Sequence, residues 1–162
     1  MGNRIFIISV ISAFAVIVAV GAGFISSRAG VCRDFSQGEV KTPITRIQVF
    51  IAASQLEQAR GLSGCQKLPN HSGMYFPFSA KQSASFWMKG MLMPIDIVWL
   101  ADNKVVGISA FVPPPSGKLD EELPRYVSPQ PVDAVLEVAA GKAASYGLKK
   151  GTQIVYEKTT QN

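Results

Sequence analysis

The sequence predicts a mainly β fold of the β-rich α+β class. We expect a small compact barrel-like or sandwich domain with two short helices, after an N-terminal transmembrane helix. Seven or so short apolar segments, separated by turn residues, are typical of strands. Only two brief segments are predicted to be helical. One long uncharged run stands at the N-terminus, and the remaining length suits a single domain.

Residues 5–25 are that uncharged run, 21 residues between two arginines. This length meets the roughly 20 residues needed to span a bilayer and exceeds the about 7–15 apolar residues of a usual cleaved signal peptide. We therefore expect residues 1–28 to be a membrane anchor, with a removed signal segment as the alternative. The polar, glycine-containing residues 29–43 would form a linker to an exported β-rich domain over residues 44–158.

Both alternatives place the domain outside the cytoplasm. The expected location is the cytoplasmic membrane, single-pass, with the domain facing the periplasm or exterior. The formal charge is +5, but the basic residues are scattered, and Lys149 and Lys150 are the only adjacent pair. Nucleic-acid binders usually show a basic stripe with interleaved aromatics. The expected partners are therefore the membrane, through residues 5–25, and an unknown envelope protein or small ligand, with no nucleic acid.

Cys32 and Cys65 are the two cysteines, and in an exported chain they are a disulfide candidate. The bridge would tie the segment next to the membrane to the domain and would stabilise it by roughly 3 kcal/mol. The alternative is two unrelated thiols.

The exported part begins with a strand and a helix. Alternating apolar side chains predict a strand over residues 44–51. Ser54 followed by Glu57 is a helix-start signal, so a short helix is predicted over residues 55–62. A brief strand over residues 74–78 would then be stopped by its proline.

The middle of the chain predicts more strands, over residues 84–88, 95–100 and 104–112. Asp102 and Asn103 separate the last two runs, which is a strong signal for a β-hairpin.

The C-terminal third opens with residues 112–132, which hold six of the ten prolines and an acidic cluster. A loop of about 20 residues inside a compact domain is often functional or mobile. A strand over residues 134–138, a short helix over residues 141–146 and a last strand over residues 151–157 complete the domain.

Residues 85–100 are the stretch around which we expect the domain to be organised. They hold both tryptophans, three of the five methionines and a single acid, Asp96. A central proline divides them into two core strands joined at a bend. We expect this bend to bring Lys89 and Asp96 close together.

Six short motifs occur in a recognisable order: Arg60-Gly61-Leu62, Gly73-Met74-Tyr75-Phe76, Phe86-Trp87-Met88-Lys89, Pro94-Ile95-Asp96, Val135-Leu136-Glu137 and Gly141. This pattern resembles the domain-of-unknown-function family numbered 192, also called uncharacterised protein family 0127, over about residues 45–157. The resemblance implies a compact β-rich fold and frequent export or membrane anchoring, with no established activity. The chain departs from it at Gly90 and Met91, where relatives carry Asn-Thr, and at Cys65, where they are often basic.

The binding candidates are Arg60, Lys89, Asp96, Glu137 and Trp87. The charged ones adjoin apolar sequence, so an acid and a guanidinium buried together would form a charge-assisted pair. One hypothesis is a pocket for an anionic or hydroxyl-bearing ligand, or a two-carboxylate acid/base site. The other is a set of paired charges that fixes strand register, since breaking such a pair typically costs about 3–5 kcal/mol. Trp87 could stack against a planar ligand or belong to the core.

No metal site and no cofactor are predicted. Met88, Met91 and Met93, with Met74 nearby, have thioethers that suit Cu(I), but methionine is also a common filler of irregular cores, and we favour that interpretation. His71, the single histidine, lies in a turn without a neighbouring ligand or nucleophile.

The sequence leaves three functions open. The first is a membrane-anchored extracytoplasmic binding or accessory module of the cell envelope. The second is an acid/base enzyme that uses Asp96 and Glu137 on an envelope glycan or peptide. The third is a structural partner of another envelope protein. Convergence of Arg60, Asp96 and Glu137 on a solvent-open pocket is the observation that would distinguish them best.

Overall fold

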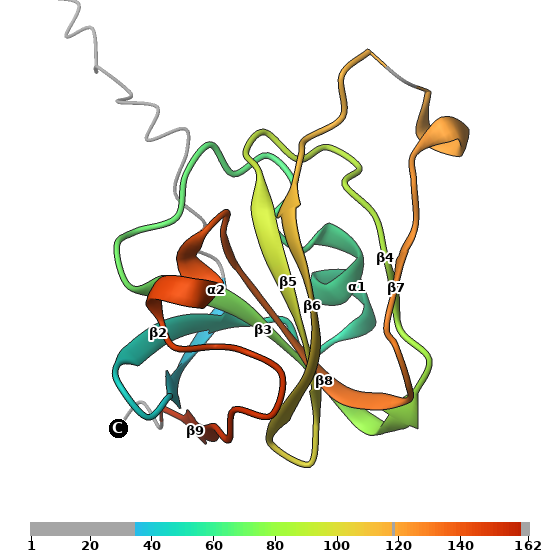
Figure 1. Ribbon diagram of the computed structural model, residues 1–162. Helices are drawn as coiled ribbons and strands as arrows, with labels where there is room; N and C mark the ends of the chain where they lie inside the picture. Colours follow the sequence, from blue (N-terminus) through green and yellow to red (C-terminus); the bar gives the residue numbers. More distant parts are fainter. Residues whose placement is uncertain (1–34, 118, 160–162) are drawn as a thin grey trace, which may run out of the picture.

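A seven-stranded sheet forms the body of the protein (Figure 1). The structure is a computed structural model that describes residues 35–117 and 119–159. Across the sheet the order is β6-β5-β8-β3-β2-β1-β9. In chain order its strands are β1 (Ser36–Lys41), β2 (Arg46–Ile51), β3 (Ser72–Gln82), β5 (Ile95–Ala101), β6 (Lys104–Val112), β8 (Val132–Ala139) and β9 (Val155–Lys158). The other elements are a ribbon of β4 (Ser85–Phe86) and β7 (Tyr126–Val127), the helices α1 (Gln55–Arg60) and α2 (Lys142–Ser145), and the 3₁₀ turn η1 (Asp120–Glu122).

The mainly β prediction is confirmed, and the architecture is sandwich-like. The barrel alternative is wrong, because the sheet is open. Neighbouring strands are antiparallel except β2 and β3, which are parallel and joined through α1. A parallel pair needs a crossover connection, and the short helix supplies it. An isolated bridge between Lys104 and Gln153 and a few backbone hydrogen bonds join the start of β6 to the segment before β9, and no ladder closes the sheet among the described residues.

Buried apolar side chains cover both faces of the sheet. On β5, Ile97 belongs to one buried cluster, whereas its neighbour Val98 belongs to the other. The first cluster also contains Leu62, which follows α1, and the second contains Ala143 of α2. We call these sides the α1 face and the α2 face. Because successive side chains of a strand alternate between faces, position along β5 and β8 decides the face on which each side chain lies.

Helix α1 begins where the sequence predicts. The Ser54 hydroxyl accepts a hydrogen bond from the Glu57 N–H at 3.2 Å, and the Glu57 carboxylate accepts one from the Ser54 N–H at 2.8 Å. This reciprocal pair satisfies two backbone donors at the start of the helix. The helix ends at Arg60 because Gly61 adopts a positive φ of 48°. Arg60 is thereby held at the last turn of a short, fixed helix.

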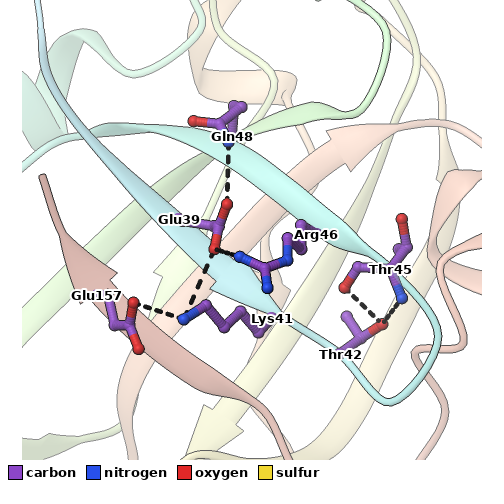
Figure 2. A network of polar contacts seen from close by, with 7 residues as sticks. All are labelled: Glu39, Lys41, Thr42, Thr45, Arg46, Gln48 and Glu157. Carbon is purple, nitrogen blue, oxygen red and sulfur yellow. Dashed lines mark hydrogen bonds and ion pairs between the residues drawn. The ribbon is translucent and has the colours of Figure 1, made fainter.

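Strand β1 departs from the prediction, because residues 36–41 were expected to be part of a linker. The strand pairs with both β2 and β9. Its polar side chains lie on the outer side, where Glu39 accepts from Arg46 and Gln48, both at 3.1 Å, and Lys41 lies 2.6 Å from Glu157 (Figure 2). The polar composition of residues 36–41 therefore reflects the solvent-exposed face of a strand and not a linker.

Other strand boundaries shift by smaller amounts. Strand β3 continues through Pro77 to Gln82 with a shift in its register to β8, whereas a stop at the proline was expected. The predicted strand over residues 84–88 is reduced to the two residues of β4. The predicted hairpin is confirmed, and both of its turn residues, Asp102 and Asn103, have positive φ.

The proline-rich residues 113–117 and 119–131 form an arm that returns beside β4. Strand β7 pairs with β4, and the Ser128 N–H donates to the Ala84 carbonyl oxygen at 2.9 Å. Figure 1 shows η1 at the outer end of this arm, away from the sheet. The arm is thus attached along the β4 ribbon.

The predicted anchor over residues 5–25 lies outside the described residues. Within the described ranges, no helix has the length and apolar character to cross a membrane.

Candidate functional site

A pocket of about 320 Å³ opens on the α1 face of the sheet. Its walls come from the end of α1, from β3 and from the segment that contains β4. The lining residues of α1 and the turn after it are Gln58, Ala59, Arg60, Gly61 and Leu62. The others are Phe76, Phe78, Gln82, Ser83, Ala84, Ser85, Phe86, Trp87, Lys89, Met91 and Glu137. The volume lies at the lower end of the range of small-molecule sites.

Four of the five predicted binding residues line this pocket: Arg60, Trp87, Lys89 and Glu137. The rest of the wall was not among the binding candidates, although Gly61, Leu62, Phe76 and Phe86 belong to the family motifs. Phe76 and Phe78 are two positions apart on β3, and this alternation could have indicated that they share a face. The polar residues between β3 and β4 carry no comparable signal, because their position at the pocket depends on how the β4–β7 ribbon packs against the sheet.

Glu137 is buried in the middle of the sheet. On β8 it stands opposite Met74 of β3 and Ile97 of β5, both fully buried apolar residues. Only 5% of its surface is exposed. Burial disfavours the charged form of a carboxyl group, and here it raises the pKa of Glu137 to about 8. The group therefore holds its proton at neutral pH.

The Glu137 carboxyl group makes no hydrogen bond or ion pair with any other described residue. Every fully enclosed side-chain nitrogen or oxygen in the described part of the chain has a partner. The Glu137 carboxyl is therefore not fully enclosed, and it meets the space of the pocket. A buried acid that contacts an open pocket and lacks a protein partner is a candidate for ligand contact.

Asp96 lies on the opposite side of the sheet from Glu137. In the β5–β8 register Asp96 faces Val138, while Ile97 faces Glu137, so the two acids alternate between faces. The Asp96 carboxylate accepts the Phe111 N–H at 2.9 Å and the Ala143 N–H at 3.0 Å. It thus ties β5 to β6 and to the first turn of α2. The structure gives Asp96 a bonding role and does not bring it to the pocket.

The expected proximity of Lys89 and Asp96 is wrong. Lys89 instead lies 2.6 Å from Asp120 of η1 and sits over the Trp87 ring, 5.3 Å from its centroid. The Arg125 guanidinium lies over the same ring at 3.8 Å. Two residues of the arm therefore engage the pocket-lining Trp87 and Lys89. The Arg60 guanidinium lies 5.3 Å from the centroid of the Phe35 ring.

Gly90, where the chain departs from the family pattern, has a structural reason to be glycine. Its φ is 66°, and a Cβ built on it would collide with the Ser63 hydroxyl. The Gly90 carbonyl oxygen accepts the Gly64 N–H at 2.9 Å. This close approach fixes the segment after β4 against the turn after α1, on the two sides of the pocket.

The methionines considered for copper are core residues. Met74, Met88, Met91 and Met93 are all buried in the cluster of the α1 face, where they pack against other apolar side chains. Among the described residues no group of three or more His, Cys, Asp or Glu side chains is placed to hold a metal ion. Trp99 is also core, with its Nε1–H donating to the Ser109 hydroxyl at 3.2 Å.

Cys65 is buried and is not a free thiol. Its predicted partner, Cys32, lies outside the described residues. The pairing of these two cysteines stays a prediction.

Comparisons with known proteins show the family by a family model and the fold by two solved structures. Residues 37–156 match the DUF192 family, described as Uncharacterized ACR. A crystal structure from Sinorhizobium meliloti 1021, of a protein provisionally called a transcription regulator, is 22% identical, with a TM-score of 0.68 over 77% of this chain and 97% of that one. A protein of unknown function from Novosphingobium aromaticivorans DSM 12444 is 29% identical, with a TM-score of 0.62 over 74% of this chain and 83% of that one. No curated protein matches the chain.

Proposed function

Because the chain belongs to the DUF192 family, which is described only as uncharacterized, we propose from its site that the domain binds a small organic ligand. The ligand would occupy the pocket between α1 and the β4 segment, with its polar end at Glu137. On this proposal the protein is a binding or accessory module.

The observation that supports this proposal is the environment of Glu137. A carboxyl group buried without a partner is costly, and a sequence under no other demand would replace it with an apolar residue. Here it forms part of the wall of a pocket with aromatic and amide side chains. Apolar walls with a few polar groups that fix orientation are typical of small-molecule sites.

An acid/base enzyme is the alternative that the same residue supports. A carboxyl with a raised pKa can donate a proton near neutral pH. Such an enzyme would use Glu137 without Asp96, because these two acids lie on opposite faces of the sheet. The third candidate, a structural partner of another envelope protein, would use the arm, whose outer end carries η1.

The proposed setting is the cell envelope. Residues 5–25 would anchor the chain in the cytoplasmic membrane, and the domain would face the periplasm or exterior. A Cys32–Cys65 disulfide would suit that oxidising location.

Intact mass spectrometry of the full-length protein tests this setting. We expect the mass to rise by about 2 Da on reduction, the two hydrogens of one opened disulfide. We also expect the unreduced mass to correspond to all 162 residues, about 17.4 kDa. An unchanged mass after reduction would contradict the disulfide, and a mass lower by 20 or so residues would show a removed signal segment.

Protein-observed NMR with a set of one-ring aromatic compounds of positive, neutral and negative charge tests binding. We expect at least one compound to shift the amide signals of residues 58–62 and 82–87, the two segments on either side of the pocket. Ser83→Trp places a large ring at the pocket wall and should weaken binding about 10-fold or more. Lys150→Trp, at an exposed turn position outside the pocket lining, is the control and should bind normally.

Two results would oppose the proposal. One is that no compound of any charge shifts these segments. The other is that Ser83→Trp binds as tightly as the unaltered protein.

A further inference from the structure

We propose that the ligand of this pocket is an organic cation, a protonated amine on a small apolar or aromatic body, with its nitrogen at the Glu137 carboxyl group. The inference rests on the proposed function and adds the chemical class of the ligand. It follows from three features: the carboxyl group at the floor of the pocket, the aromatic walls, and the contacts that the two cations at its edge already make.

The floor is a carboxyl group among apolar neighbours. An ammonium group would supply the opposite charge that the ionised form of Glu137 lacks in the unliganded protein, and charge pairs are stronger in an environment of low dielectric constant. The added hydrogen bonds would be charge-assisted. An anionic group at the same place would meet a carboxyl that becomes still harder to ionise, and it would gain no ion pair.

The walls are aromatic. Phe76, Phe78, Phe86 and Trp87 all line the pocket. Phe76 and Phe86 meet edge to face, with centroids 5.1 Å apart. Aromatic faces attract cations, and groups of rings recognise substituted ammonium ligands in other proteins. In this structure Trp87 already has the Arg125 and Lys89 cations over its ring, which shows that the local environment accepts positive charge.

Two cations also line the pocket, and both have other contacts. Lys89 lies 2.6 Å from Asp120, which offsets its charge. Arg60 lies over the Phe35 ring. Arg60, Lys89 and Glu137 are the ionisable residues of the lining, and only Glu137 is buried deeply enough to lose most of its hydration. Glu137 is therefore the lining residue that would gain most from a binding partner, and the partner that suits a carboxylate is a cation.

Binding an ammonium group would release a proton. At neutral pH the Glu137 carboxyl is protonated in the absence of ligand, since burial raises its pKa. When the ammonium binds, the carboxylate forms and its proton passes to the buffer, while the amine keeps its own proton. Binding of a neutral alcohol would leave Glu137 protonated and release none.

Calorimetry of the full-length protein at pH 7 with benzylamine, benzyl alcohol and benzoate tests the inference. These probes share one ring and differ in charge. We expect benzylamine to bind at least about 10-fold more tightly than benzyl alcohol, a difference of roughly 1.4 kcal/mol, and benzoate to bind least. Titrations in two buffers with different ionisation enthalpies should give close to one proton released per benzylamine bound.

Glu137→Gln should weaken benzylamine binding about 10-fold or more, abolish proton release and leave benzyl alcohol binding nearly unchanged. Glu121→Gln, an exposed acid of η1 outside the pocket lining, should change none of these values. Equal binding of benzylamine and benzyl alcohol, or no proton release, would overturn the cation inference while the pocket remained a binding site. Absence of binding by all three probes, and by the wider NMR set, would overturn both proposals.

Discussion

Asp96→Asn should lower the free energy of unfolding by about 3 kcal/mol, because it leaves a buried backbone N–H without an acceptor. Asp96 is 1% exposed, and its two oxygens accept one N–H each, from Phe111 and Ala143. Asparagine has one oxygen and one NH2 group, so one of those N–H groups would face another donor. An unsatisfied buried donor costs about 1–3 kcal/mol, and hydrogen bonds to a charged acceptor are the stronger kind.

Thermal unfolding of the full-length protein measures this effect, with a fall in Tm of roughly 10 °C for a domain of this size. Asp102→Asn is the matched control. Asp102 is exposed, pairs with Lys81 and has a φ of 51°, a conformation that asparagine adopts readily. Exposed ion pairs contribute about 0–1 kcal/mol, so this control should change Tm little. A loss below about 1 kcal/mol in Asp96→Asn would contradict the bonding role of Asp96.

Much of the fold could be predicted because its signals are local. The capping pair of Ser54 and Glu57 determines where α1 begins, and Asp102 with Asn103 determines the hairpin turn. Each involves residues three or fewer positions apart. Strand β1 escaped prediction because its outer face is polar and Val40 is its only buried apolar side chain. A sequence with so few apolar positions shows no alternation of apolar and polar residues, so it cannot be distinguished from a polar linker.

The candidate site was predicted only in part, because four of the five binding candidates line the pocket and Asp96 does not. Arg60, Lys89, Trp87 and Glu137 were chosen for their motifs and apolar neighbours, and they line one pocket. Asp96 was grouped with them because it shares those properties. The register of β5 on β8 separates it, and that register joins segments about 40 residues apart in the sequence. A shift by one residue would exchange the faces of every side chain, so no local pattern could have decided this point.

Glu137→Gln should have the opposite effect on stability from Asp96→Asn, and its size should depend on pH. Burial raises the folded pKa of Glu137 from the ordinary 4.5 to about 8, so the folded protein holds this proton more tightly than the unfolded chain. The cost of ionising Glu137 in the folded protein lowers stability. This cost is absent below about pH 4.5, grows as the pH rises through the folded pKa, and is complete above about pH 9. Glutamine is neutral throughout and removes this pH-dependent loss.

We therefore expect Glu137→Gln to match the unaltered protein near pH 4.5 and to be more stable by about 3–5 kcal/mol at pH 9, at roughly 1.4 kcal/mol per pKa unit. Urea unfolding of the full-length protein at both pH values measures the difference, with Glu121→Gln as an exposed control that should show none. The same difference at both pH values would mean that Glu137 ionises without cost. A gain in stability from replacing Glu137, together with a loss of ligand binding, would indicate that this residue serves binding at a cost to the fold.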